Sequence, residues 1–109
     1  MQPGHTLVVP IVEIDHWLDL DPALVGHLNQ VAQTIGQAQM RAFSPQRIGL
    51  MIAGLEVPHT HLHVIPMNTV NDLDFANAQA QPDPSGLDSA AAAIRSALGE
   101  MGTTGAVEA

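Results

Sequence analysis

Short apolar runs bounded by glycine or proline predict three strands in this chain. The runs are Thr6–Val9, Arg47–Ala53 and His59–Pro66, and each is rich in apolar or β-branched residues. Only the short link Gly54–Pro58 separates the second run from the third. Because strands joined by so short a link most simply turn back on each other, we expect the last two strands to form an antiparallel pair.

Apolar residues at intervals of three or four predict a long amphipathic helix over Pro22–Arg41. Asp21 is a suitable N-cap, and Pro22 suits the first helical position. The residues of the apolar stripe are Leu24, Leu28, Val31, Ile35 and Ala38.

An alanine-rich run predicts a second helix over Ser89–Leu98. Ser85 and Asp88 have the spacing of a capping box before it, and the polar residues 68–84 are expected to form a loop. The elements together favour an α+β fold: an antiparallel β-sheet with one long helix and a C-terminal helix. The 109 residues fit one domain over residues 1–98, followed by a flexible tail over 99–109.

The charge of the chain excludes several kinds of partner. Three arginines, no lysine and eleven acidic residues give a net charge of -8, which argues against nucleic-acid binding and against an anionic membrane surface. A phosphate site would have to use histidines and backbone N–H groups. The absence of cysteine excludes disulfides and thiolate zinc sites. Since we find neither a signal peptide nor a long apolar run, we expect a cytoplasmic protein.

Three of the six histidines alternate within the segment VPHTHLHVIP. Side chains alternate between the faces of a strand, so His59, His61 and His63 are expected to share one face. Thr60, Leu62 and Val64 are then expected to face the core. A row of partly charged imidazoles is unfavourable in a sheet unless an anion or a metal lies opposite.

Metal binding and phosphate chemistry are the two alternatives for these histidines. Two of them plus another ligand could bind zinc, but His59 and His63 lie about 13 Å apart along a strand. That separation is large for Zn–N bonds of about 2.0–2.1 Å. Imidazole also donates hydrogen bonds, carries charge near pH 7 and can act as a nucleophile, which favours a polyphosphate ligand.

The segment His59–Ile65 resembles the motif His-φ-His-φ-His-φ-φ, with φ apolar, of the histidine triad (HIT) superfamily. Pro3–Pro10, PGHTLVVP, is similar to the upstream strand of that family, which carries one further active-site histidine, here His5. The resemblance covers roughly Pro3 to Met67.

The resemblance implies a small HIT-like α+β protein, a homodimer, with no cofactor. It implies a nucleotide hydrolase or nucleotidyl transferase that acts at the α-phosphate of dinucleoside polyphosphates or nucleoside phosphoramidates. His61 would be the nucleophile that forms a nucleotidyl-histidine intermediate. His59 and His63 would orient it, contact phosphate oxygens and assist the leaving group, and His5 would support His59.

The residues before the triad depart from the family pattern. Gly54-Leu55-Glu56-Val57 stands where many members have Gly-Gln-Ser/Thr-Val. We expect backbone N–H groups near Val57 to hold phosphoryl oxygens, and Glu56 to point away from them or to transfer a proton. The chain also starts almost at PGHT, so we expect a domain that is short at its N-terminus. A nucleotide-binding protein without turnover and a metal-binding protein are the alternatives.

Overall fold

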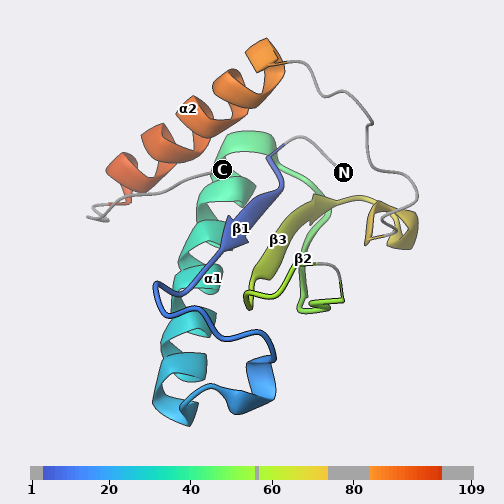
Figure 1. The fold of residues 1–109 in the computed structure, drawn as a ribbon. Helices are drawn as coiled ribbons and strands as arrows, with labels where there is room; N and C mark the ends of the chain where they lie inside the picture. The colour runs from blue at the N-terminus through green and yellow to red at the C-terminus, as the bar shows by residue number, and fades with distance from the viewer. Residues whose placement is uncertain (1–3, 56, 74–83, 102–109) are drawn as a thin grey trace.

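The computed structural model describes residues 4–55, 57–73 and 84–101. Within these ranges, three strands form an antiparallel sheet in the order β1-β3-β2, with β3 in the centre (Figure 1). The elements in chain order are β1 (Thr6–Val8), η1 (Trp17–Asp19), α1 (Pro22–Phe43), β2 (Arg47–Met51), β3 (Leu62–Met67), η2 (Val70–Leu73) and α2 (Pro84–Glu100). The α+β fold and the antiparallel pairing of β2 with β3 are therefore confirmed.

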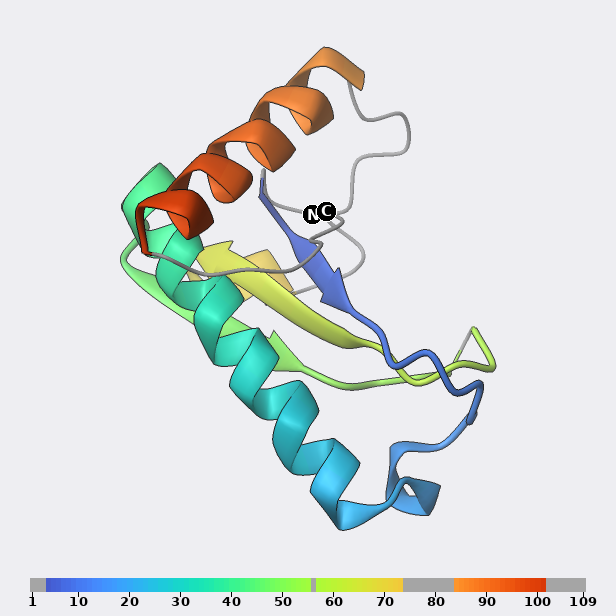
Figure 2. The same cartoon turned by 90° about the vertical axis from the view of Figure 1, so that its left-hand side faces the viewer.

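The helices and the sheet form successive layers. Helix α1 lies across one face of the sheet and α2 packs against α1 (Figures 1 and 2). Their contact is a single apolar cluster that includes Leu28 and Ile35 of α1, Leu62 and Val64 of β3, and Ile94 of α2. This cluster determines which face of β3 is internal. No helix in the described part of the chain is long and apolar enough to cross a membrane.

Helix α1 begins where the sequence predicts and ends two residues later than expected. The Asp21 carboxylate accepts a hydrogen bond from the Ala23 N–H at 2.9 Å, with Pro22 in the first turn. At the other end, Ser44 adopts a left-handed conformation and donates its N–H to the Met40 carbonyl. Pro45 then disfavours further helix.

Strand β3 begins at Leu62, three residues later than the expected start at His59. The backbone before Leu62 bonds elsewhere: the His59 N–H donates to the Val57 carbonyl, and the Thr60 N–H donates to the Ile14 carbonyl, both at 2.8 Å. These residues therefore form a turn held against the segment before η1. Of the three alternating histidines, only His63 lies within the strand.

The remaining boundaries also differ from the expected ones. Strand β2 ends at Met51 rather than at Ala53. Helix α2 begins at Pro84 and continues to Glu100, so it is longer at both ends than the alanine-rich run. A proline suits the first helical position because its missing N–H needs no intrahelical partner. Most of the expected tail, residues 102–109, lies outside the described residues.

Candidate active site

The register of the sheet brings His5 and His63 together. Leu7 of β1 lies opposite His63 of β3, and His5 is two residues before Leu7, so it shares the same face and lies diagonally across from His63. The His5 Nε2 and His63 Nδ1 atoms are 2.8 Å apart, and the ring centroids are 5.0 Å apart. Because Leu62 and Val64 face α1, the two imidazoles occupy the opposite face.

His61 lies beside this pair, and a hydrogen bond determines which of its ring nitrogens carries the hydrogen. Its ring meets the His63 ring edge-on, with centroids 4.8 Å apart. The His61 Nδ1 atom is 2.8 Å from the His59 carbonyl oxygen. A carbonyl oxygen only accepts hydrogen bonds, so Nδ1 carries the hydrogen, and in the neutral ring Nε2 keeps its lone pair. The ring of His61 thus presents Nε2 as a nucleophile or acceptor.

The His59 ring contacts another part of the chain. Its Nε2 donates to the Pro10 carbonyl at 2.8 Å, so His59 contributes its backbone carbonyl, through the bond from His61, to the histidine cluster of His5, His61 and His63. The expectation that His5 supports His59 is wrong, because His5 bonds His63. Strand alternation does not govern His59 or His61, since both precede β3.

Burial and neighbouring imidazole rings favour the uncharged forms of His5 and His63 at neutral pH. Burial, followed by the neighbouring His63 and His61 rings, lowers the pKa of His5 to about 4. Burial and the His61 ring also lower the pKa of His63. With both rings neutral, one of the two bonded nitrogens donates and the other accepts. Exchange of the donor and acceptor roles requires each ring to move its hydrogen to its other nitrogen.

Two of the three arginines lie away from the cluster. Arg41 lies 3.9 Å from Glu100, between the two helices, and Arg47 pairs with Met67 at the end of β3 remote from His63. An anionic ligand in the cluster would therefore meet the imidazole rings rather than Arg41 or Arg47. Among the described residues, no group of three or more histidine, cysteine or acidic side chains could hold a metal ion.

The two remaining predicted site residues stay untested. Val57 is half exposed, and its carbonyl accepts the His59 N–H, but the expected role of its own N–H remains a prediction. Glu56 lies outside the described residues. Its neighbour Leu55 is almost fully exposed.

Sequence reasoning missed Gln39, a fully buried residue of α1. Its Nε2 donates to the carbonyls of Gly4 and Val64, the neighbours of His5 and His63, at 2.8 and 2.9 Å. The sequence signal that could have identified Gln39 is its place in the apolar stripe, four positions after Ile35, although it is polar.

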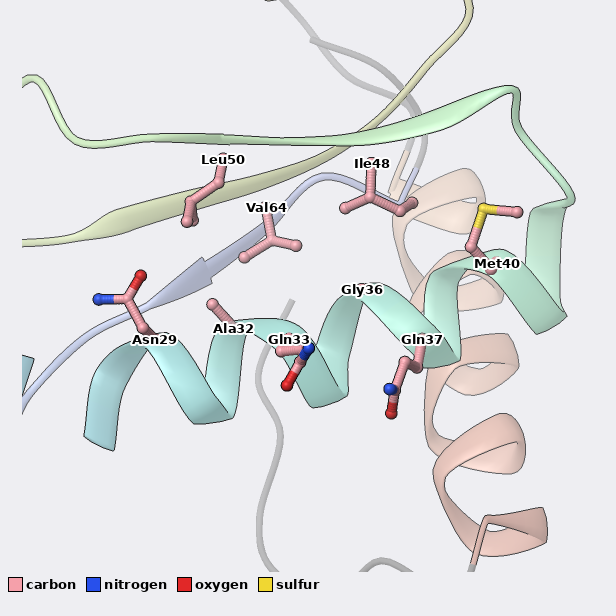
Figure 3. Close-up of a pocket in the computed structure, with 9 residues that line it drawn as sticks. All are labelled: Asn29, Ala32, Gln33, Gly36, Gln37, Met40, Ile48, Leu50 and Val64. Carbon is pink, nitrogen blue, oxygen red and sulfur yellow. The ribbon is translucent and has the colours of Figure 1, made fainter. Parts of the chain in front are cut away.

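A separate groove of about 360 Å³ lies between α1 and the sheet (Figure 3). No titratable side chain of the described residues lines it. Its walls consist of apolar residues, small residues and amide side chains: Asn29, Ala32, Gln33, Gly36, Gln37, Met40, Ile48, Leu50 and Val64. Since Val64 and His63 are adjacent in β3, the groove and the histidine cluster lie on opposite faces of that strand.

Comparison with protein families gives one family match. A family model described as the HIT domain matches residues 1–70, more than half of the chain. Among curated proteins, a bis(5'-nucleosyl)-tetraphosphatase [asymmetrical] of Schizosaccharomyces pombe is 30% identical over 86 residues, which are 71% of this chain and 47% of that protein. The chain thus spans about half the length of this relative.

Solved structures give the same fold. A Hit-like protein involved in cell-cycle regulation from Bartonella henselae, solved with an unknown ligand, is 27% identical with a TM-score of 0.70; the match covers 89% of this chain and 72% of that one. A zinc-bound histidine triad family protein from Mycobacterium smegmatis is 25% identical with a TM-score of 0.72, over 93% and 73% of the two chains.

Proposed function

The chain belongs to the HIT family, and from that premise we propose that it is a nucleotide hydrolase or nucleotidyl transferase that acts at the α-phosphate. The observation that carries this proposal is the hydrogen bond from His61 Nδ1 to the His59 carbonyl at 2.8 Å. It leaves the Nε2 lone pair of His61 available for attack on phosphorus. Similarity to a dinucleoside tetraphosphatase supports dinucleoside polyphosphates as substrates, with nucleoside phosphoramidates as a second class.

The proposed reaction has two steps at His61. The Nε2 lone pair attacks the α-phosphorus, a P–N bond forms, and the bond from phosphorus to the leaving group breaks. The leaving group takes a proton from a neighbouring imidazole that the charge of the bound polyphosphate holds in its protonated form, for which we propose His63, whose ring contacts that of His61. Water then attacks phosphorus, the P–N bond breaks, and the water proton returns to the imidazole. The product is a nucleoside monophosphate; another acceptor in place of water gives transfer.

Hydrogen bonding to the His59 carbonyl also stabilises the intermediate. After attack, the His61 ring is positively charged, and its Nδ1–H remains directed at that carbonyl. A hydrogen bond from a charged donor is roughly twice as strong as one between neutral groups. Backbone N–H groups near Val57 would hold the phosphoryl oxygens, and Glu56 would turn away from them or transfer a proton.

We extend the proposal to a cytoplasmic homodimer. Strand β2 is an edge of the sheet, and an unpaired edge can pair with another chain. Beside it, the half-exposed side chains of Met40 and Leu50 border the groove of Figure 3, and a second copy would cover them. Sedimentation should give twice the chain mass for the protein and a smaller value for Leu50→Glu.

Covalent labelling tests the catalytic proposal. We expect label from a radiolabelled adenylyl phosphoramidate or diadenosine polyphosphate to remain on the protein after an acid-free quench. The His61→Ala variant should remain unlabelled with an unchanged melting temperature. A wild-type protein that is neither labelled nor active on either substrate class would contradict the proposal.

Nucleotide binding without turnover is the second candidate. It is favoured by Leu55, an almost fully exposed apolar side chain at the place where many relatives carry glutamine. Calorimetry with a non-hydrolysable dinucleoside polyphosphate distinguishes the two, because this candidate predicts binding with no labelled His61. Stoichiometric zinc after purification without chelators would instead favour a metal-binding protein.

A further inference from the structure

The position of His5 depends on contacts outside the strand ladder. Strand β1 begins at Thr6, which pairs with Val64, so His5 lies one residue before the paired region. Gly4, before it, has a φ of +84°, a conformation that favours glycine. Other contacts must therefore fix this backbone if the 2.8 Å bond from His5 to His63 is to persist.

Gln39 provides such contacts from the opposite face of the sheet. Its side chain rises from α1 and is completely buried. One amide hydrogen is donated to the Gly4 carbonyl at 2.8 Å and the other to the Val64 carbonyl at 2.9 Å. Gly4 precedes His5 and Val64 follows His63. A single amide group thus joins the two backbone segments that carry the hydrogen-bonded imidazoles.

We propose that Gln39 is a positioning residue that holds His5 at hydrogen-bonding distance from His63 by bridging the carbonyls of Gly4 and Val64. The Thr6 hydroxyl acts in the same direction, since it donates to the Gly4 carbonyl at 2.9 Å. The importance of this role for turnover rests on the proposed function. The geometry itself can be measured without any substrate.

Packing alone accounts poorly for an amide at this place. The Gln39 Oε1 atom is buried, and it has no hydrogen-bond partner among the described residues, which is unfavourable. Methionine has a similar length and would fill the space without burying an unpaired oxygen. The two carbonyls, however, require two donors at one point, and an amide NH₂ group supplies two.

The experiment is an NMR titration of the histidine rings in the wild type and in Gln39→Met. Loosening of the backbone around Gly4 should expose His5 and separate it from His63. The pKa of His5 should then rise from about 4 toward 6.5, and the ring-nitrogen signals of a hydrogen-bonded pair should be lost. A His5→Gln sample identifies the signals of His5. Gln37→Met is the matched control, because Gln37 lies on α1 but is exposed.

Each outcome decides the proposal. A rise in the His5 pKa in a folded Gln39→Met protein, with none in Gln37→Met, supports it. Unchanged His5 signals in a folded Gln39→Met protein overturn it, since lower stability alone does not alter a native-state pKa. If Gln39→Met does not fold, Thr6→Val decides in its place, because the Thr6 hydroxyl also bonds the Gly4 carbonyl. A rise in the His5 pKa that is smaller than the one expected for Gln39→Met supports the role, and no rise in that pKa overturns it. Absence of turnover in the wild type would contradict the catalytic proposal and leave this titration unaffected.

Discussion

The histidine cluster and the groove beside α1 lie on opposite faces of β3, and they differ in what they offer a ligand. The groove has about 360 Å³ of space and no titratable group among the described residues of its lining, whereas the cluster has three imidazoles in contact. Their separation follows from strand alternation, which directs Val64 to one face and His63 to the other. The comparison teaches that the larger cavity and the perturbed titratable groups need not coincide in this fold, and the proposed function assigns the chemistry to the perturbed groups.

The largest expected effect is a difference in turnover between a variant of the histidine cluster and a variant of the groove. His61→Ala should lower turnover by about 10³-fold or more, because it removes the proposed nucleophile. Gln33→Ala changes a polar residue of the groove and should leave turnover nearly unchanged. Steady-state rates with a dinucleoside polyphosphate measure both variants. Equal losses in the two would contradict the division of roles between the faces.

Within the cluster, His5 and His63 should behave as one unit. Replacement of His63 by asparagine should lower turnover by about 10²-fold, because the proposed proton transfer to the leaving group is lost. His5 contacts His63 through one ring nitrogen, so adding His5→Asn to His63→Asn should cost little more. Rates of the two single variants and the double variant give the coupling. Fully additive losses would show that His5 acts independently of His63.

Alanine substitutions at two glycines, one next to the cluster and one in α1, should change stability in opposite directions. A Cβ at Gly4 would collide with the Phe43 ring, and its φ of +84° is unfavourable for other residues. We expect Gly4→Ala to lower the free energy of unfolding by about 2 kcal/mol. At Gly26 in α1, an added Cβ would meet no atom within 4 Å. Gly26→Ala should therefore raise the free energy of unfolding by about 0.5–1 kcal/mol. Urea unfolding measures the free energy of unfolding of both variants. If the two substitutions change it by similar amounts, the backbone before His5 is not tightly anchored.

Local patterns predicted the elements that contain the site, whereas long-range hydrogen bonds determined its details. Helix α1 and the β2–β3 pair follow from periodicity and a short link, which are local properties. The late start of β3 could not be predicted, because the Thr60 N–H bonds to Ile14, far away in sequence. The partner of His5 depends on the register of β1 with β3. Periodicity alone does not determine that register.

The role of Gln39 was hidden for a different reason. Its position in the apolar stripe indicates burial, but the carbonyls it bonds belong to two segments far apart in the sequence, at Gly4 and Val64. Only the folded backbone brings them together. A polar residue in an apolar stripe therefore indicates where to look, and the structure identifies the partners.

A pH dependence of stability should also originate in the cluster. The pKa of His5 is about 4 in the folded protein against an ordinary value of 6.5, so the unfolded chain binds its proton more tightly. Between pH 6.5 and 4 the unfolded state therefore carries more protons, and stability falls as the pH falls. Above pH 6.5 this contribution is constant. His63, whose pKa is also lowered, acts in the same direction.

The Asp72 carboxylate does not act in the same pH window. The pKa of Asp72 is lowered from 3.8 because its carboxylate accepts the N–H groups of Asn68 and Thr69, so its stabilising effect is lost mainly below about pH 4. Melting temperatures of the wild type and His5→Asn between about pH 4 and 7.5 isolate the histidine contribution. The slope should be smaller in His5→Asn. If the melting temperatures of the two proteins change equally with pH, His5 has the same pKa in the folded cluster as in the unfolded chain. The cluster would then contribute no more to the pH dependence of stability through His5 than the groove does.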